Sequence, residues 1–116
     1  MEELAQWLKS QHKGLRTYKT FQQKVLEIGS KKQRQYALFY LLAMLVGRFI
    51  DAYDENPLML NVAGEAHKRL VAFTDKAVRF NSMTPQEQIE LLNEIAVSEL
   101  TESSTQKRRG SRDPLL

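Results

Sequence analysis

An uninterrupted run of 11 apolar residues, YALFYLLAMLV from Tyr36 to Val46, constrains the fold of this chain more than any other feature. A helix that spans a bilayer needs about 20 such residues, and Gly47 and Arg48 end this run well before that length. The run therefore predicts a buried core helix, and no association with a membrane is expected.

A helix built from this run is apolar around its whole circumference. Each helix of a small four-helix bundle normally exposes one face to water, so full coverage requires contacts beyond the chain's own helices. Self-association is the simplest source of such contacts. The candidate residues for it are Tyr36, Phe39, Tyr40 and Met44.

Few residues interrupt the chain, since only five Gly and three Pro occur in 116 residues, and this favours long helices over short strands. The first expected helix keeps apolar residues in a seven-residue repeat, as an amphipathic helix does. Gln11 and Gly14 interrupt that repeat, so a kink or a break is expected there. Four helices are expected, over residues 2–28, from 31–35 to 54, 62–80 and 85–100.

Local signals mark the starts of the last two helices. Asn61 is a candidate N-cap, and Thr84 followed by Pro85 and Glu87 is the pattern of a capping box. The expected buried face of the third helix is Ala63, Ala66, Leu70, Phe73, Ala77 and Phe80. The expected buried face of the fourth is Ile89, Leu92, Ile95 and Ala96.

These helices predict an all-α, four-helix bundle-like single domain over residues 1–100. The remaining segment, TESSTQKRRGSRDPLL over 101–116, has too few apolar residues to build a core and is expected to be a disordered basic tail. Its basic residues could contact phosphate or mark a basophilic kinase site, or they simply keep the end of the chain soluble. That basic cluster is Lys107, Arg108, Arg109 and Arg112.

Charge is unevenly distributed along the chain, although the net charge is only +3. Residues 9–34 hold eight Lys or Arg and one acid, whereas residues 87–102 hold five Glu and no basic residue. On one long first helix, a basic stripe would face the solvent and attract an anionic partner. The residues of that stripe, and the expected partner-binding residues, are Lys9, His12, Lys13, Arg16 and Lys19.

The stripe leaves three partners open: an acidic protein surface, nucleic acid, or an acidic helix of the same chain or of a second copy. Asp51, Asp54 and Glu55 form a further carboxylate cluster at the end of the apolar helix, suited to a cation or to plain solvation. Arg48, one turn earlier, is a candidate partner for that cluster.

Residue types needed for much catalytic chemistry are missing. The chain has no Cys, which excludes disulfides, thiolate zinc sites, iron–sulfur clusters and a Cys nucleophile. His12 and His67 lack the spacing of a di-iron or zinc site, and the chain has neither a glycine-rich phosphate loop nor a serine elbow. No metal, cofactor or enzymatic activity is therefore expected. A ligand pocket among Trp7, Phe21, Tyr36 and Phe73 is the remaining alternative of that kind.

The stretch TYKTFQ, Thr17 to Gln22, resembles the core of the helical Rubisco assembly chaperones of cyanobacteria. The resemblance covers six residues, and the loops and later helices follow another pattern, so it assigns no site residue. It implies only that a small dimeric helical chaperone is among the alternatives.

The sequence as a whole predicts a non-catalytic protein-interaction module, such as an adaptor, an assembly factor or a small helical chaperone. It would act as a homodimer with a basic helix face that binds an acidic protein. The alternative is a nucleic-acid-binding accessory protein that uses the first helix and the tail. The start MEELAQWLKS carries two acids, unlike the basic start of a secretory signal, so a cytoplasmic location is expected.

Overall fold

The computed structural model describes residues 1–54 and 56–101. These residues form α-helices joined by short connections and two short 3-10 helices, without a strand, so the all-α class is confirmed. The tail and its basic cluster at Lys107, Arg108, Arg109 and Arg112 lie outside the described residues. The helices are α1 (Glu2–Ser10), α2 (Leu15–Lys31), α3 (Tyr36–Tyr53), α4 (Leu60–Val78) and α5 (Pro85–Val97), and the 3-10 helices are η1 (Gln33–Gln35) and η2 (Phe80–Ser82).

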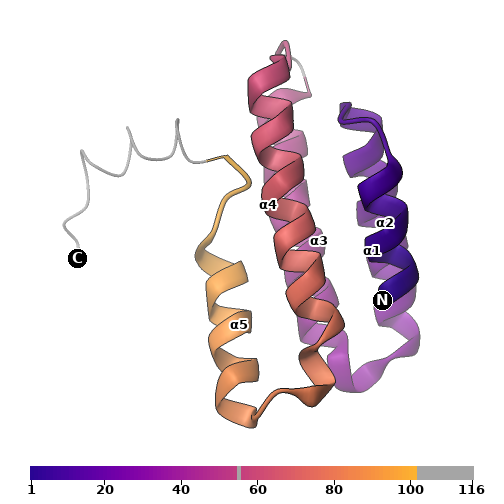
Figure 1. The fold of residues 1–116 in the computed structure, drawn as a ribbon, viewed down its shortest axis with the longest axis vertical. Helices are drawn as coiled ribbons and strands as arrows, with labels where there is room; N and C mark the ends of the chain where they lie inside the picture. Colours follow the sequence, from indigo (N-terminus) through magenta and orange to yellow (C-terminus); the bar gives the residue numbers. More distant parts are fainter. Residues whose placement is uncertain (55, 102–116) are drawn as a thin grey trace, which may run out of the picture.

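The helices are arranged in two layers, with α1 and α4 in front of α2 and α3 in the view of Figure 1. The chain reverses direction at each connection between consecutive helices. Helix α2 packs along α3, α1 packs on α4, and α5 packs against α3 on the side away from the α1–α2 pair. Helix α3 is therefore the central helix, as the apolar run predicts.

The break expected at Gln11 and Gly14 is confirmed, and it divides the first expected helix, residues 2–28, into α1 and α2, with α1 folded back along α2. Gln11 and Gly14 both have extended backbone angles, and Gly14 is the N-cap of α2. The Thr17 hydroxyl donates a hydrogen bond of 2.8 Å to the His12 carbonyl and so fixes the connection. The break lets the apolar sides of both helices face one core, to which they contribute Leu4, Leu8, Tyr18, Phe21 and Val25.

Helices α2 and α3 approach closely at Gly29. A Cβ atom at this position would lie 2.8 Å from the Cβ of Phe39, closer than two carbon atoms can pack. Further along the pair, the Gln22 amide donates a 3.1 Å hydrogen bond to the carbonyl of Ala43. Phe39 is buried where the two helices approach at Gly29.

Helix α4 begins at Leu60, two residues earlier than expected, and its N-cap is Met59. Asn61 is therefore not the N-cap, and that prediction is wrong, because the residue already lies inside the helix. All residues of the predicted buried face are buried, although Phe80 belongs to η2 because α4 ends at Val78: Ala63, Ala66, Leu70, Phe73, Ala77 and Phe80.

The capping box at the start of α5 is confirmed. The Glu87 amide donates to the Thr84 hydroxyl at 3.1 Å, and the Thr84 amide donates to the Glu87 carboxylate at 2.8 Å. The predicted buried face of α5 is correct at Ile95, holds in part at Leu92, which is half-buried against the core, and is wrong at Ile89 and Ala96, which are exposed. Helix α5 instead turns Leu91 toward the core.

The segment Gln33–Tyr53 is long and apolar enough to cross a membrane by length and composition. Of the window that meets this test, 44% is buried inside the fold. The core helix of a packed protein has the same composition, and here α2 and α5 lie against α3.

Candidate protein-interaction surfaces

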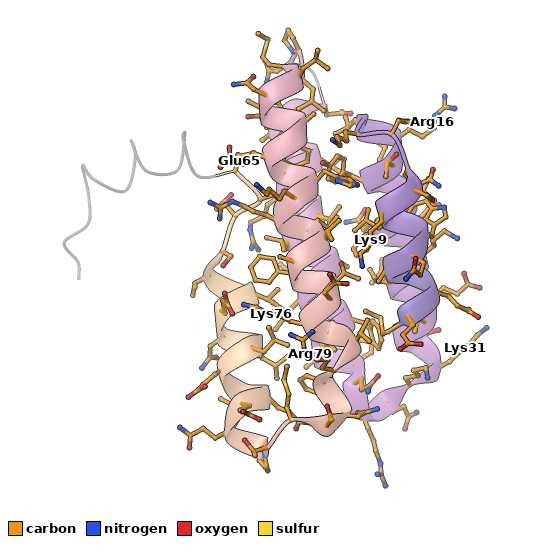
Figure 2. The ribbon with its side chains drawn as sticks, in the orientation of Figure 1. Lys9, Arg16, Lys31, Glu65, Lys76 and Arg79 are labelled. Atoms are coloured by element: carbon orange, nitrogen blue, oxygen red, sulfur yellow. The ribbon has the colours of Figure 1, made fainter. Side chains whose placement is uncertain are left out.

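The five residues predicted to form one basic stripe lie on different parts of the molecule. Lys9 lies between α1 and α4, where it forms an ion pair with Asp75 at 3.2 Å (Figure 2). Lys19, on α2, forms an ion pair with Asp54 at 3.4 Å. The single stripe is therefore wrong, because the break after α1 reverses the chain and turns Lys9 toward α4.

The other three residues of the predicted stripe lie at the start of α2. His12 and Lys13 belong to the α1–α2 connection, and Arg16 extends outward from the first turn of the helix (Figure 2). The Nδ1 atom of His12 accepts a 3.3 Å hydrogen bond from the Gly14 amide. Lys13 and Arg16 form no ion pair with another described residue, so their charges face the solvent.

Helix α3 exposes an apolar stripe that neither α2 nor α5 covers. The stripe consists of Tyr36, Tyr40 and Met44, which are 52%, 45% and 41% exposed and follow one another at every fourth position. The rings of Tyr36 and Tyr40 stack with their centroids 5.9 Å apart. No charged residue occurs between Tyr36 and Gly47 in the sequence. We call these three residues the α3 face.

Phe39, the fourth residue predicted for self-association, does not belong to the α3 face. It is 1% exposed and packs on Gly29 of α2, so it is part of the core of one chain. The other large exposed apolar residues described lie on α2, at the start of α4 and on α5, outside the α3 face, and exposed apolar residues of this kind are common on protein surfaces. They are Leu26, Met59, Leu60, Ile89 and Val97.

Opposite charges lie near the two ends of α3. Arg34 is exposed in η1, just before the helix, and Asp51 is exposed in its last turn. Neither forms an ion pair with another described residue. The expected pairing of Arg48 with the carboxylate cluster is wrong for Asp51 and Asp54, and Glu55, the third residue of that cluster, lies outside the described residues. Arg48 instead donates to the Ser98 carbonyl at 2.7 Å and lies 3.9 Å from the Glu99 carboxylate, because α5 ends beside it.

A groove with a volume of about 380 Å³ lies between α1 and the second half of α2. The apolar side chains that line it are Leu4, Trp7 and Ile28, with Met1 at its end. The Lys24 ammonium lies 5.1 Å from the centre of the Trp7 ring. The charged side chains at the rim are Glu3, Lys24, Glu27, Lys31 and Lys32.

We call this cavity the α1–α2 groove. Sequence reasoning missed it, because it treated α1 and α2 as one helix, and the groove exists only after the chain turns back at Gly14. The predicted pocket among Trp7, Phe21, Tyr36 and Phe73 is not formed. Phe21 and Phe73 are buried in the core, and Tyr36 lies on the outer side of α3.

The remaining polar side chains singled out by the sequence have structural partners. His67 is buried, and its Nε2 atom lies 2.9 Å from the Leu8 carbonyl, which joins α4 to α1. The Tyr18 hydroxyl donates to the Ala63 carbonyl at 3.2 Å, and burial raises the pKa of Tyr18 above its usual value. Among the residues that the structure describes, no three His, Asp or Glu side chains gather as metal ligands would.

Comparison of the chain with protein-family models, with curated proteins and with solved structures finds no match. The two surfaces that remain for a functional interpretation are the α3 face and the α1–α2 groove.

Proposed function

We propose that this chain is a non-catalytic protein-interaction module that acts as a homodimer through the α3 face. The observation that carries the proposal is the exposed, uncharged stripe of Tyr36, Tyr40 and Met44 on the central helix. The centres of protein interfaces are enriched in Tyr and Met and depleted of charged residues. Such a module would serve as an adaptor, an assembly factor or a small helical chaperone.

The charges at the ends of α3 support a second copy of the chain as the occupant of this face. In a dimer with two-fold symmetry, the same surface of both copies meets, and two copies of α3 can run antiparallel. Arg34 of one copy then approaches Asp51 of the other, and the contact occurs twice. Negative charge near the C-terminal end of a helix is unfavourable, so a basic neighbour would relieve it.

An acidic protein is the proposed partner of this dimer. Lys9 and Lys19 are engaged within the chain, whereas Lys13 and Arg16 have no ion pair with a described residue and keep their charges available. Nucleic-acid binding by a continuous basic first helix has no comparable support, because α1 and α2 do not share one face.

Sedimentation at tens of micromolar protein tests the dimer. We expect a mass of two chains for the wild type and of one chain for Tyr40→Glu, which places a charge in the α3 face. The matched control is Leu60→Glu, at a position that is 91% exposed on α4, and this variant should remain dimeric. A monomeric wild type, or a dimeric Tyr40→Glu variant that is fully folded, would contradict the proposal.

A further inference from the structure

The α1–α2 groove combines an apolar floor with a rim in which cations outnumber acids. Trp7 and Ile28 are partly exposed in the floor, and Leu4 closes it toward the core. Lys24 and Lys31 lie two turns apart on α2, and Lys32 follows the last turn. None of the three lysines forms an ion pair with another described residue.

The shape of the groove favours a peptide segment as its occupant. Its lining residues follow α1 from Met1 to Trp7 and α2 from Lys24 to Lys31, which is about two turns of each helix, or roughly 10 Å. Lys31, one of the residues that line the groove, extends outward from the end of α2 (Figure 2). A helix or an extended segment can lie along such a groove and insert a large apolar side chain.

The charges of the rim favour an acidic peptide over a nucleic acid. A nucleic acid carries a negative charge at every phosphate, and along the groove these phosphates would meet Glu3 and Glu27 as well as the lysines. A peptide can place its carboxylates at Lys24 and Lys31 alone. Charge-assisted hydrogen bonds to those ammonium groups would add to the apolar contact.

We propose that the α1–α2 groove binds an acidic segment of a partner protein, with a large apolar side chain against Trp7 and Ile28 and carboxylates on Lys24 and Lys31. The cation–π contact with the Trp7 ring holds the Lys24 ammonium at the edge of the apolar floor, where a carboxylate of the peptide can reach it. This assignment rests on the proposed function as an interaction module and gives its acidic partner a site. It does not depend on the dimer.

Trp7 is the only tryptophan of the chain, so its fluorescence reports directly on this groove. The probe is a short synthetic peptide in which Asp and Glu alternate with Leu, and the matched peptide carries Lys in place of the acids. We expect a saturable change in Trp7 emission with the acidic peptide and none with the basic one. Added salt should weaken the response, because the rim is exposed to solvent.

Two variants distinguish binding in the groove from nonspecific attraction of the acidic peptide to surface lysines. Lys24→Gln combined with Lys31→Gln should weaken binding of the acidic peptide about tenfold, since each exposed ion pair contributes modestly. Lys68→Gln removes an exposed lysine of α4 outside the groove and should leave the affinity unchanged. Circular dichroism checks that the variants keep their helices.

Several outcomes would overturn this assignment. They are the absence of a saturable change with the acidic peptide, an equal response to the basic peptide, equal effects of the Lys68 and double variants, and tighter binding of a single-stranded oligonucleotide. The monomeric Tyr40→Glu variant should bind the acidic peptide as the wild type does. If the wild type is a dimer that does not bind the peptide, the peptide site in the α1–α2 groove is ruled out and the dimer through the α3 face stands. If the wild type is a monomer that binds the peptide, the dimer is ruled out and the peptide site stands.

Discussion

Gly29 decides at the scale of a single residue how closely α2 and α3 pack. Its backbone angles are ordinary for a helix, so its role is the close approach and not a special conformation. A methyl group here would meet the Cβ of Phe39 at 2.8 Å, and Phe39 is itself enclosed in the core. The pair can separate only if one helix shifts.

We therefore predict that Gly29→Ala destabilises the fold by about 1–3 kcal/mol, the usual cost of overpacking. The control is Gly64→Ala in the interior of α4, where a new Cβ meets nothing within 4 Å. It should stabilise the protein by about 0.5–1 kcal/mol through helix propensity. Urea denaturation of both variants measures the difference, and stabilisation by both would show that α2 and α3 do not pack as described.

Tyr18 makes the stability of the fold depend on alkaline pH. Burial raises its pKa in the folded state above the value of about 10 of the unfolded chain. The folded state thus holds this proton more tightly, so the contribution to stability is complete below about pH 10 and is lost progressively as pH rises above it.

We predict that Tyr18→Phe has a smaller loss of stability above about pH 10 than the wild type, because Phe has no proton to lose. At neutral pH the variant should be less stable by about 1 kcal/mol, since the hydrogen bond to the Ala63 carbonyl is gone. Denaturation in urea across the alkaline range gives both quantities. Parallel curves for the two proteins would assign the alkaline loss to other groups.

At the scale of the element, α5 has the clearest start signal in the chain. Both hydrogen bonds of its capping box are present, and Pro85 occupies the first position of the helix. We predict that Thr84→Ala costs about 0.5–2 kcal/mol and speeds amide exchange in the first turn of α5. Gln86→Ala, an exposed position in the same turn, should change stability by less than about 0.5 kcal/mol. Equal effects of the two would mean that the box does not hold this helix.

The sequence predicts those elements whose limits depend on local chemistry. Thr84 and Pro85 place the start of α5, and the apolar run places α3 within a few residues. The break at Gln11–Gly14 also has a local signal. The direction that α1 takes after this break has no local signal. It depends on packing against α4, where His67 contacts the Leu8 carbonyl.

The candidate surfaces are harder to predict than the elements, because they too depend on packing between helices and not on local signals. Phe39 and Tyr40 are adjacent in an entirely apolar run, so periodicity alone does not say which one faces α2. In the structure Phe39 packs against Gly29 of α2, and Tyr40 is therefore exposed. On α5, Ile89 and Leu91 are both compatible with a helical stripe, and the contact of α5 with α3 selects Leu91.

At the scale of the whole molecule, a small part of the uneven charge is matched by ion pairs between elements, since only Lys9 and Lys19 of the basic residues in 9–34 form one with another described residue. Lys9 forms an ion pair with Asp75, Lys19 with Asp54, and Lys76 of α4 with Glu94 of α5. These side chains are about half exposed, so each pair contributes at most about 1 kcal/mol. Arg34 and Asp51, near the two ends of α3, are among the charged residues that form no ion pair with another described residue, so they are available for contacts outside the chain.

Arg34 and Asp51 provide a test of the antiparallel arrangement of the proposed dimer. Arg34→Asp and Asp51→Arg should each weaken the dimer about tenfold, because each change replaces two symmetric attractions by two repulsions. The double variant exchanges the charges and should recover nearly the wild-type dissociation constant, since opposite charges face each other again. Sedimentation over a dilution series measures all four proteins. If the double variant is weaker than either single one, the two copies of α3 do not run antiparallel with these ends in contact.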